Sequence, residues 1–323
     1  MKKLVLIAAL LITQSNILYG KDPNTSLSST CADERAVGYH KFKFGDLTIT
    51  ALYDGQVDLG IEMLNGLEFT DHEKLISMTD SKTGKLPTSV NAFLISDKKQ
   101  NILVDTGTAN FFGPSLGKLL CNLERSGTKS ASVSSILITH LHPDHIGGLS
   151  NIGVNNPFPK TRIYVHQEEI KYWLGESSSE SLPPMLKPFV SMIREALQHH
   201  RTNGLIKAFD YESTLVMNIK PLPAFGHTPG HTAFEITSNK KSFVILGDLI
   251  HSHSLQFAKP TIAIEFDSDR TAAIENRISI LEYTAKKNSL VAGMHLPFPG
   301  IGYVDGDRNN GFKWRPVERS TTH

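Results

Sequence analysis

The sequence is poor in cysteine, the residue that would mark a disulfide scaffold or a thiolate metal site. It has only two cysteines, Cys31 and Cys121, in 323 residues. Two are too few to define a disulfide framework, so one disulfide and two buried thiols both remain open. Neither cysteine lies near a histidine-rich segment. The sequence therefore argues against cysteine as a metal ligand.

Net charge and long apolar runs are also scarce. With 33 basic and 32 acidic side chains, the formal net charge is +1, so no strong field attracts nucleic acid. Outside the first twenty residues, no apolar run approaches the roughly 20 residues of a membrane-spanning helix. We expect neither a nucleic-acid partner nor stable membrane insertion. The 40% hydrophobic content is typical of a globular protein with a sizeable core.

The first twenty residues have the order of a secretory signal peptide. Lys2 and Lys3 form a basic start, residues 4–12 are apolar, and the small Gly20 closes the segment. An uncleaved anchor is the alternative. We expect residues 1–20 to be a signal peptide and residues 21–37 a polar linker. Residues 38–323 would then form a single domain that is exported, to the periplasm or the medium.

The rest of the chain alternates strand-like and helix-like segments. Apolar runs and alternations predict strands over residues 40–55, 89–107 (a hairpin), 134–140, 161–166, 215–222, 231–237, 242–248 and 289–295. Apolar residues at helical spacing predict helices over residues 113–127, 186–200 and 270–287. This order indicates an α/β layered fold without an obvious second domain.

One segment concentrates histidine and aspartate directly after an apolar strand. In ITHLHPDHIGG, the residues His140, His142, Asp144 and His145 lie within six positions. At an extended strand end, residues i and i+2 point to one side, so His140 and His142 can hold one ion. Pro143 then turns the chain, and Asp144 and His145 begin a helix that faces a second ion. A solvated loop is the alternative.

Three later motifs place further candidate ligands near strand ends. GHTPGHT carries His227 and His231, VILGD ends at Asp248, and VAGMH ends at His295. A single histidine at a strand end is usually an ordinary polar group, but the coincidence of all four motifs indicates a metal centre. An aspartate has two oxygens and can bridge two cations.

The motifs HLHPDH, GHTPGH and LGD, with the late histidine, resemble those of the metallo-β-lactamase superfamily over nearly the whole mature chain. The resemblance implies an αββα sandwich of two mixed β-sheets flanked by helices, with the site at one edge between the sheets. It also implies the ligands of two metal ions. One ion would be held by His140, His142 and His227, and the other by Asp144, His145 and His295. Asp248 would bridge the two ions.

The branch of the superfamily is narrowed by the residues around these ligands. Asp248 argues against a true β-lactamase, which has cysteine or serine at that place. FFGPSLGKLL, GDLIHSHSLQF and HLPFPGIGYV resemble the branch of methyl parathion hydrolase, lactonases and arylesterases. This implies a secreted hydrolase of lactones and aryl esters that uses a metal-bridging hydroxide. The alternatives are an organophosphate hydrolase, a glyoxalase II-like thioesterase and a non-enzymatic metal-binding protein.

The ligand set contains nitrogen and oxygen donors but no thiolate. Two zinc ions are expected, with Co, Mn or Fe as alternatives. Asp105 is expected to orient a ligand histidine, with a plain turn residue as the alternative. His231 is expected to support the site and not to bind metal. His251, three residues after Asp248, is expected beside the leaving group, with a surface histidine as the alternative.

An apolar pocket for a small lactone or ester should surround the metals. Its aromatic candidates, each of which is equally compatible with a core position, are Phe111, Phe112, Tyr172, Trp173, Phe189 and Phe257. The natural substrate, its acyl chain length and the oligomeric state do not follow from the sequence, and a homodimer remains open.

Overall fold

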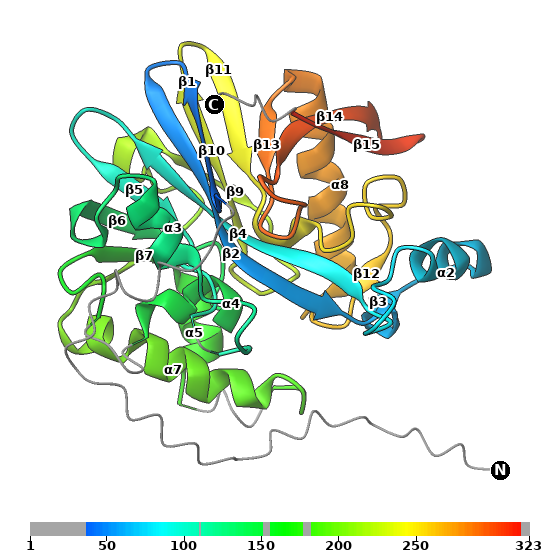
Figure 1. Ribbon diagram of the computed structural model, residues 1–323, viewed down its shortest axis with the longest axis horizontal. Helices are drawn as coiled ribbons and strands as arrows, with labels where there is room; N and C mark the ends of the chain where they lie inside the picture. The colour runs from blue at the N-terminus through cyan, green and yellow to red at the C-terminus, as the bar shows by residue number, and fades with distance from the viewer. Residues whose placement is uncertain (1–36, 110, 151–155, 177–181, 318–323) are drawn as a thin grey trace.

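The computed structural model describes residues 37–109, 111–150, 156–176 and 182–317. The expected signal peptide, nearly all of the linker and Cys31 lie outside these ranges. Two β-sheets pack face to face, and helices cover the outer face of each (Figure 1). The predicted αββα sandwich is confirmed. Within the described residues, no helix is long and apolar enough to span a membrane.

The first sheet has seven strands in the order β1-β2-β4-β5-β6-β7-β8. Their bounds are β1 (Tyr39–Phe44), β2 (Leu47–Leu59), β4 (Leu86–Ser96), β5 (Asn101–Val104), β6 (Val133–Leu137), β7 (Arg162–His166) and β8 (Ile206–Phe209). Neighbours are antiparallel from β1 to β5 and parallel from β5 to β8. The helices on this side of the molecule are α3 (Leu119–Arg125), α4 (Pro143–Ile146), α5 (Gln167–Leu174) and α7 (Lys187–Thr202).

The second sheet has six strands in the order β15-β14-β13-β11-β10-β9. Their bounds are β9 (Lys220–Pro223), β10 (Thr232–Ser238), β11 (Lys241–Ile245), β13 (Leu290–Ala292), β14 (Ile301–Asp307) and β15 (Gly311–Pro316). Helix α8 (Arg270–Lys287) packs on its outer face. The short strands β3 (Leu64–Asn65) and β12 (Ala263–Ile264) pair near helix α2 (Phe69–Ile76). Short 3-10 turns are η1 (Ile61–Met63), η2 (Ser130–Ser132), η3 (Gly147–Leu149), η4 (Val216–Asn218) and η5 (Gly247–Leu249).

Strand β4 contributes side chains to two hydrophobic cores, one on each face of the first sheet. Ala92 and Leu94 belong to the core under the helices of the first sheet, and Phe93 and Ile95 to the core between the sheets. Successive side chains of a strand point to opposite faces, so a continuous apolar run is needed where both faces are covered.

Two predicted elements are shorter than expected because the backbone turns left-handed. The helix predicted over residues 113–127 begins at Leu119, because Gly117 has a φ of 80° and passes close to the carbonyl oxygen of Ala109. The strand predicted over residues 215–222 begins at Lys220, since Met217 and Asn218 have φ values of 56° and 55°. Neither conformation fits a regular helix or strand.

Parallel strand pairs bring the candidate residues to one edge of the sandwich. In β11 and β13, Ile245 pairs with Ala292, so Asp248 and His295 each follow their strand by three residues. In β5 and β6, Val104 pairs with Leu137, so Asp105 and His140 also follow neighbouring strand ends. The carboxyl ends of parallel strands point the same way, which places these four residues together.

Candidate metal centre

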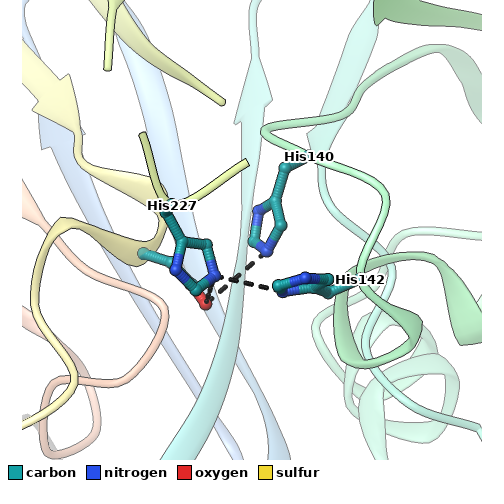
Figure 2. A group of neighbouring side chains, drawn as sticks. His140, His142 and His227 are labelled. Atoms are coloured by element: carbon teal, nitrogen blue, oxygen red, sulfur yellow. Dashed lines mark hydrogen bonds and ion pairs between the residues drawn. The ribbon is translucent and has the colours of Figure 1, made fainter. Parts of the chain in front are cut away.

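The segment after β6 carries the first four candidate ligands. His142 precedes α4 in an extended conformation, with a φ of −65° and a ψ of 147°, and Pro143 opens the helix. Proline suits that position because the first N–H of a helix has no partner within the helix. The extended chain places His140 and His142 on the same side, where both rings approach His227 (Figure 2).

His140, His142, His227 and Asp248 form the first cluster. All four side chains are buried, and their potential ligand atoms lie within 4.8 Å of one another. Nε2 of His227 lies 3.0 Å from Nδ1 of His142. Oδ2 of Asp248 lies 3.6 Å from Nε2 of His140 and 3.4 Å from Nε2 of His227. The side chains therefore converge on a single point.

Asp144, His145 and His295 form the second cluster with the same Asp248. Nε2 of His145 lies 3.2 Å from Oδ1 of Asp248 and 3.5 Å from Oδ2 of Asp144. Nε2 of His295 lies 3.1 Å from Oδ2 of Asp248 and 3.4 Å from Oδ2 of Asp144. Asp248 is thus common to both clusters.

These side chains fit metal ions better than hydrogen bonds to one another. Among the described residues, Nε2 of His140, Nε2 of His145 and Oδ1 of Asp248 are buried without a hydrogen-bond partner. Four nitrogen–oxygen separations, of 3.4 to 3.6 Å, are long for hydrogen bonds, and two others are 3.1 and 3.2 Å. They match the ~3.3 Å between two ligands that each lie about 2.0–2.1 Å from a tetrahedral zinc ion. The residues present therefore fit a dinuclear metal site.

Oxygen atoms behind three of the rings fix their orientation. Oδ2 of Asp105 lies 2.7 Å from Nδ1 of His145, and Oδ1 of Asp267 lies 2.9 Å from Nδ1 of His227. The carbonyl oxygen of Ser89 lies 2.9 Å from Nδ1 of His295. Donating Nδ1–H to these oxygens leaves the Nε2 lone pair of each ring directed at the centre.

Asp105 lies where the sequence predicted it, against a histidine of the centre. Its φ of 59° is unusual for a residue with a side chain. Three hydrogen bonds hold it: its N–H donates to Leu137, and its carboxylate accepts from the N–H and hydroxyl of Thr139. The strained conformation keeps the carboxylate behind His145.

Two orienting groups have no signal in the sequence. Asp267 lies in a turn before α8, and the Ser89 contact is made by a backbone carbonyl in β4. They lie 40 and 206 residues from the histidines that they contact. Tertiary folding brings each pair together, and for Ser89 and His295 it is the packing of one sheet against the other.

The pKa values of the rings follow from burial and from the nearby carboxylates. Burial lowers the pKa of His140 and His142 well below the usual value, which leaves both rings neutral. Burial also acts to lower the pKa of His227, but Asp248 and Asp267 outweigh it and raise that pKa to about 9. A proton and a metal ion therefore compete for Nε2 of His227.

His231 supports Asp248, as expected of a residue that is not a ligand. Its Nδ1 lies 2.9 Å from the carbonyl oxygen of Ala224, and its Nε2 accepts a 2.9 Å hydrogen bond from the N–H of Asp248. Burial lowers the pKa of His231 to about 3, so the ring is neutral with its proton on Nδ1. Gly247, with a φ of 59°, lets the backbone pass the ring, because a Cβ there would collide with Nε2.

His251 lies inside the site and is only 7% exposed, which excludes the surface alternative. Its Nε2 lies 3.1 Å from Oδ2 of Asp248, and its ring stacks on His295 with 5.2 Å between centroids. Within the described part of the chain, its buried Nδ1 has no hydrogen-bond partner. Gln256 holds the backbone here by accepting from the N–H groups of His251 and Ser252.

A group of three phenylalanine side chains lies beside the first cluster. The ring of Phe189 lies 5.6 Å from that of His142 and 6.3 Å from that of Phe112. Phe266, which was not predicted, lies 6.3 Å from His142 and 6.5 Å from Phe189. Since Phe112 is 37% exposed, this group extends from the metal centre to the protein surface.

The other predicted pocket residues are placed differently. Phe257 is buried, belongs to the core under α8 and stacks on Trp314, so its assignment to the pocket is wrong. Trp173 is fully buried behind His142, where its Nε1 donates to Glu169. It is a core residue that contacts the centre from behind. The remaining two, Phe111 and Tyr172, are partly buried and pack against the core of the first sheet.

Known families and curated proteins with similar sequences include metallo-hydrolases, as the candidate metal centre suggests. The model of the Metallo-beta-lactamase superfamily matches residues 86–295. "Probable metallo-hydrolase YybB" of Bacillus subtilis (strain 168) is 25% identical over 145 residues, which cover 45% of this chain and 56% of that protein. "N-acyl homoserine lactonase" of Bacillus cereus is 28% identical over 173 residues, 48% of this chain and 60% of that protein. The chain thus spans little more than half the length of these curated relatives.

Two solved structures are similar over most of the chain. The "hydrolase AbOPH in beta lactamase superfamily" has a TM-score of 0.83 and 34% identity, and the match covers 88% of this chain and 99% of that one. "AidC, a Dizinc Quorum-Quenching Lactonase", bound to a homoserine product, has a TM-score of 0.77 and 26% identity, with 87% and 98% covered. These matches confirm the predicted superfamily and fold, and they support a metal-dependent hydrolase.

Replacing His231 tests how Asp248 is held. In His231→Leu, the N–H of Asp248 and the carbonyl of Ala224 lose their partners, which should lower stability by about 1–3 kcal/mol and reduce the zinc content. His200→Leu is the matched control, because His200 is a buried histidine whose Nε2, among the described residues, hydrogen-bonds to the carbonyl of Phe158 and not to the metal centre. Elemental analysis and thermal unfolding measure both variants. Equal zinc content in the two would contradict the role given to His231.

Proposed function

The chain belongs to the metallo-beta-lactamase superfamily, and from this premise we propose that it is a dinuclear metal-dependent hydrolase of lactones and aryl esters. The observation that carries the proposal is the pair of clusters that share Asp248, in which every residue but the partly exposed Asp144 is buried. Similarity to a dizinc lactonase over 87% of the chain supports both the two ions and the substrate class.

We infer the ligands from the two clusters. His140, His142 and His227 would hold one ion, Asp144, His145 and His295 the other, and Asp248 would contact both. Imidazole and carboxylate donors without a thiolate favour zinc, and Co, Mn and Fe remain alternatives. When bound, the paired ions lower the pKa of water and polarise an ester carbonyl.

The side chains around the centre would select and orient the substrate. Phe112, Phe189 and Phe266 offer an apolar surface beside His142, which suits the acyl or aryl part of a neutral ester. Asp105, Asp267 and His231 hold the centre rigid, so its geometry is set before the substrate arrives.

His251 is proposed to serve the leaving group. Its ring lies 4.9 Å from that of His227 and 5.2 Å from that of His295, between centroids. It therefore lies against both sets of ligands. Its Nδ1 has no hydrogen-bond partner among the residues that the structure describes, and its Nε2 faces Oδ2 of Asp248. The ring would therefore donate from Nδ1 as an imidazolium, give that proton to the oxygen that leaves the substrate, and become neutral with its remaining proton on Nε2.

We also propose that the protein is exported. The basic, apolar and small-residue order of residues 1–20 supports export. Cys121 is disulfide-bonded. Disulfides persist mainly in oxidising compartments, which agrees with a periplasmic or secreted protein.

Metal analysis tests the dinuclear site. We expect two ions per chain in the wild type and the loss of at least one in Asp248→Ala, because Asp248 lies within reach of both clusters. Asp210→Ala is the control, since Asp210 is an exposed carboxylate that contacts only its own turn. One ion in the wild type, unchanged in Asp248→Ala, would refute two metal sites.

Replacing His251 tests the substrate class. The alkoxide that leaves a lactone is strongly basic and gains roughly 10²–10⁴-fold from a positioned proton donor. A nitrophenolate needs no such donor, because it leaves readily even relative to a tyrosine phenol of pKa about 10. His251→Leu should therefore reduce kcat/KM for an alkyl lactone far more than for an aryl phosphotriester. Equal losses at unchanged metal content would remove His251 from this role.

The N-terminus of the mature protein tests export. Cleavage of the predicted signal peptide should leave a chain that begins near Lys21 in the periplasm or the medium. Mass spectrometry of the fractionated native protein identifies its first residue. Intact Met1 on protein from the soluble cytoplasm is the result that would overturn export.

A further inference from the structure

A buried carboxylate outside both clusters joins the chain segments that carry the first cluster. Glu169 lies in the first turn of α5 and has no exposed surface. Its Oε2 accepts hydrogen bonds from the N–H of Leu141 at 2.9 Å and from Nε1 of Trp173 at 3.1 Å. Its Oε1 accepts from the N–H of Gly230 at 2.8 Å.

The two backbone donors, Leu141 and Gly230, lie in the two segments that carry the histidines of the first cluster. Leu141 lies between His140 and His142, so its N–H belongs to the short segment that presents both rings. Gly230 lies in the turn between His227, the third ring of the first cluster, and His231. A single carboxylate therefore connects the two segments that supply all three rings. Leu141 lies 28 residues and Gly230 lies 61 residues from Glu169 along the chain.

The turn at Gly230 lies very close to the start of helix α5, where Glu169 is located. A Cβ at Gly230 would lie 2.8 Å from the N atom of Glu169, so only glycine lets the turn approach the helix this closely. One backbone hydrogen bond, from Thr232 to Thr139, also joins the segments. It lies outside the span from His140 to His142. The contact with Glu169 lies within that span and fixes the rings relative to the turn.

The three hydrogen bonds require an acceptor on both oxygens. These three donors, and the hydroxyl of Thr228, which also acts to lower the pKa of Glu169, favour the carboxylate form, although burial raises that pKa. A neutral amide of the same shape has only one oxygen. In Glu169→Gln, the NH₂ group must face either Gly230 or the pair of Leu141 and Trp173, so one of the two backbone connections is lost.

We propose that Glu169 is a positioning residue that sets the spacing of His140, His142 and His227, and thereby the affinity of the first metal site. The second site depends on it much less, because His145 is oriented by Asp105 and His295 by the carbonyl of Ser89. The inference rests on the proposed dinuclear function. Groups that orient metal ligands typically contribute about 10- to 100-fold in affinity, and we expect an effect of that size.

Zinc affinity measured one site at a time tests this proposal. His295→Ala removes a ligand of the second site only, and His227→Ala removes a ligand of the first site only. Competition with a chromogenic chelator then gives the zinc Kd of the remaining site. Adding Glu169→Gln should weaken zinc binding about 10- to 100-fold in the His295→Ala background. In the His227→Ala background the change should be much smaller.

A control variant separates positioning from general loss of stability. Asp54→Asn alters another fully buried carboxylate, which accepts from Thr108, Gly117 and Leu119 and contacts neither histidine segment. It should lower the melting temperature without a selective loss of first-site zinc.

The outcomes distinguish this proposal from the proposed function. Fewer than two metal ions per chain in the wild type would refute the dinuclear function itself. Two ions in the wild type, with equal weakening or no weakening of both sites by Glu169→Gln, would overturn only the role of Glu169. If Glu169→Gln does not fold, Glu169→Asp is measured in the same way, because its shorter side chain cannot reach both segments. Equal effects on both sites would again overturn the proposal.

Discussion

The carboxylate of Asp248 is the constraint on which the rest of the site depends. It is shared by both clusters, so its position decides whether all five imidazoles can face the same small volume. Parallel pairing of β11 and β13 sets that position from one side, since Asp248 and His295 follow paired residues at the same interval. His231 sets it from the other side by accepting the N–H of Asp248. A strand register and one buried ring thus define the point on which the histidines of two sheets converge.

The electrostatic character of the centre follows from its buried carboxylates. Asp105, Asp248 and Asp267 are all buried at the site, and such charges are costly unless cations or donors compensate them. Their neighbours here are imidazoles and hydrogen-bond donors: His145 and Thr139 act on Asp105, and His227 acts on Asp267. Two divalent cations would complete this compensation. The same carboxylates that orient the rings therefore also supply the negative charge that such ions require.

The sequence predicts the parts of this site that are local in the chain. Histidines two residues apart at a strand end share a side because of strand geometry, and parallel strand ends meet at one edge. Asp267, the carbonyl of Ser89 and Glu169 were missed because their roles arise only from contacts between distant segments. Phe257 was misplaced for a related reason: an aromatic residue in an apolar stretch carries no mark that separates a pocket from a core. The start of α3 likewise depended on how closely Gly117 passes Ala109.

The candidate metal centre and the aromatic side chains beside it are built from different parts of the fold. The candidate ligands follow strand ends and are held by buried groups with paired hydrogen bonds. Phe112 lies in the segment before α3, Phe189 in α7 and Phe266 in the turn before α8. Substitutions in these outer segments can reshape the apolar wall without moving the strand ends, because loops vary more freely than the scaffold that carries them. The aromatic side chains beside His142 can therefore change independently of the candidate ligands, because no strand register fixes them.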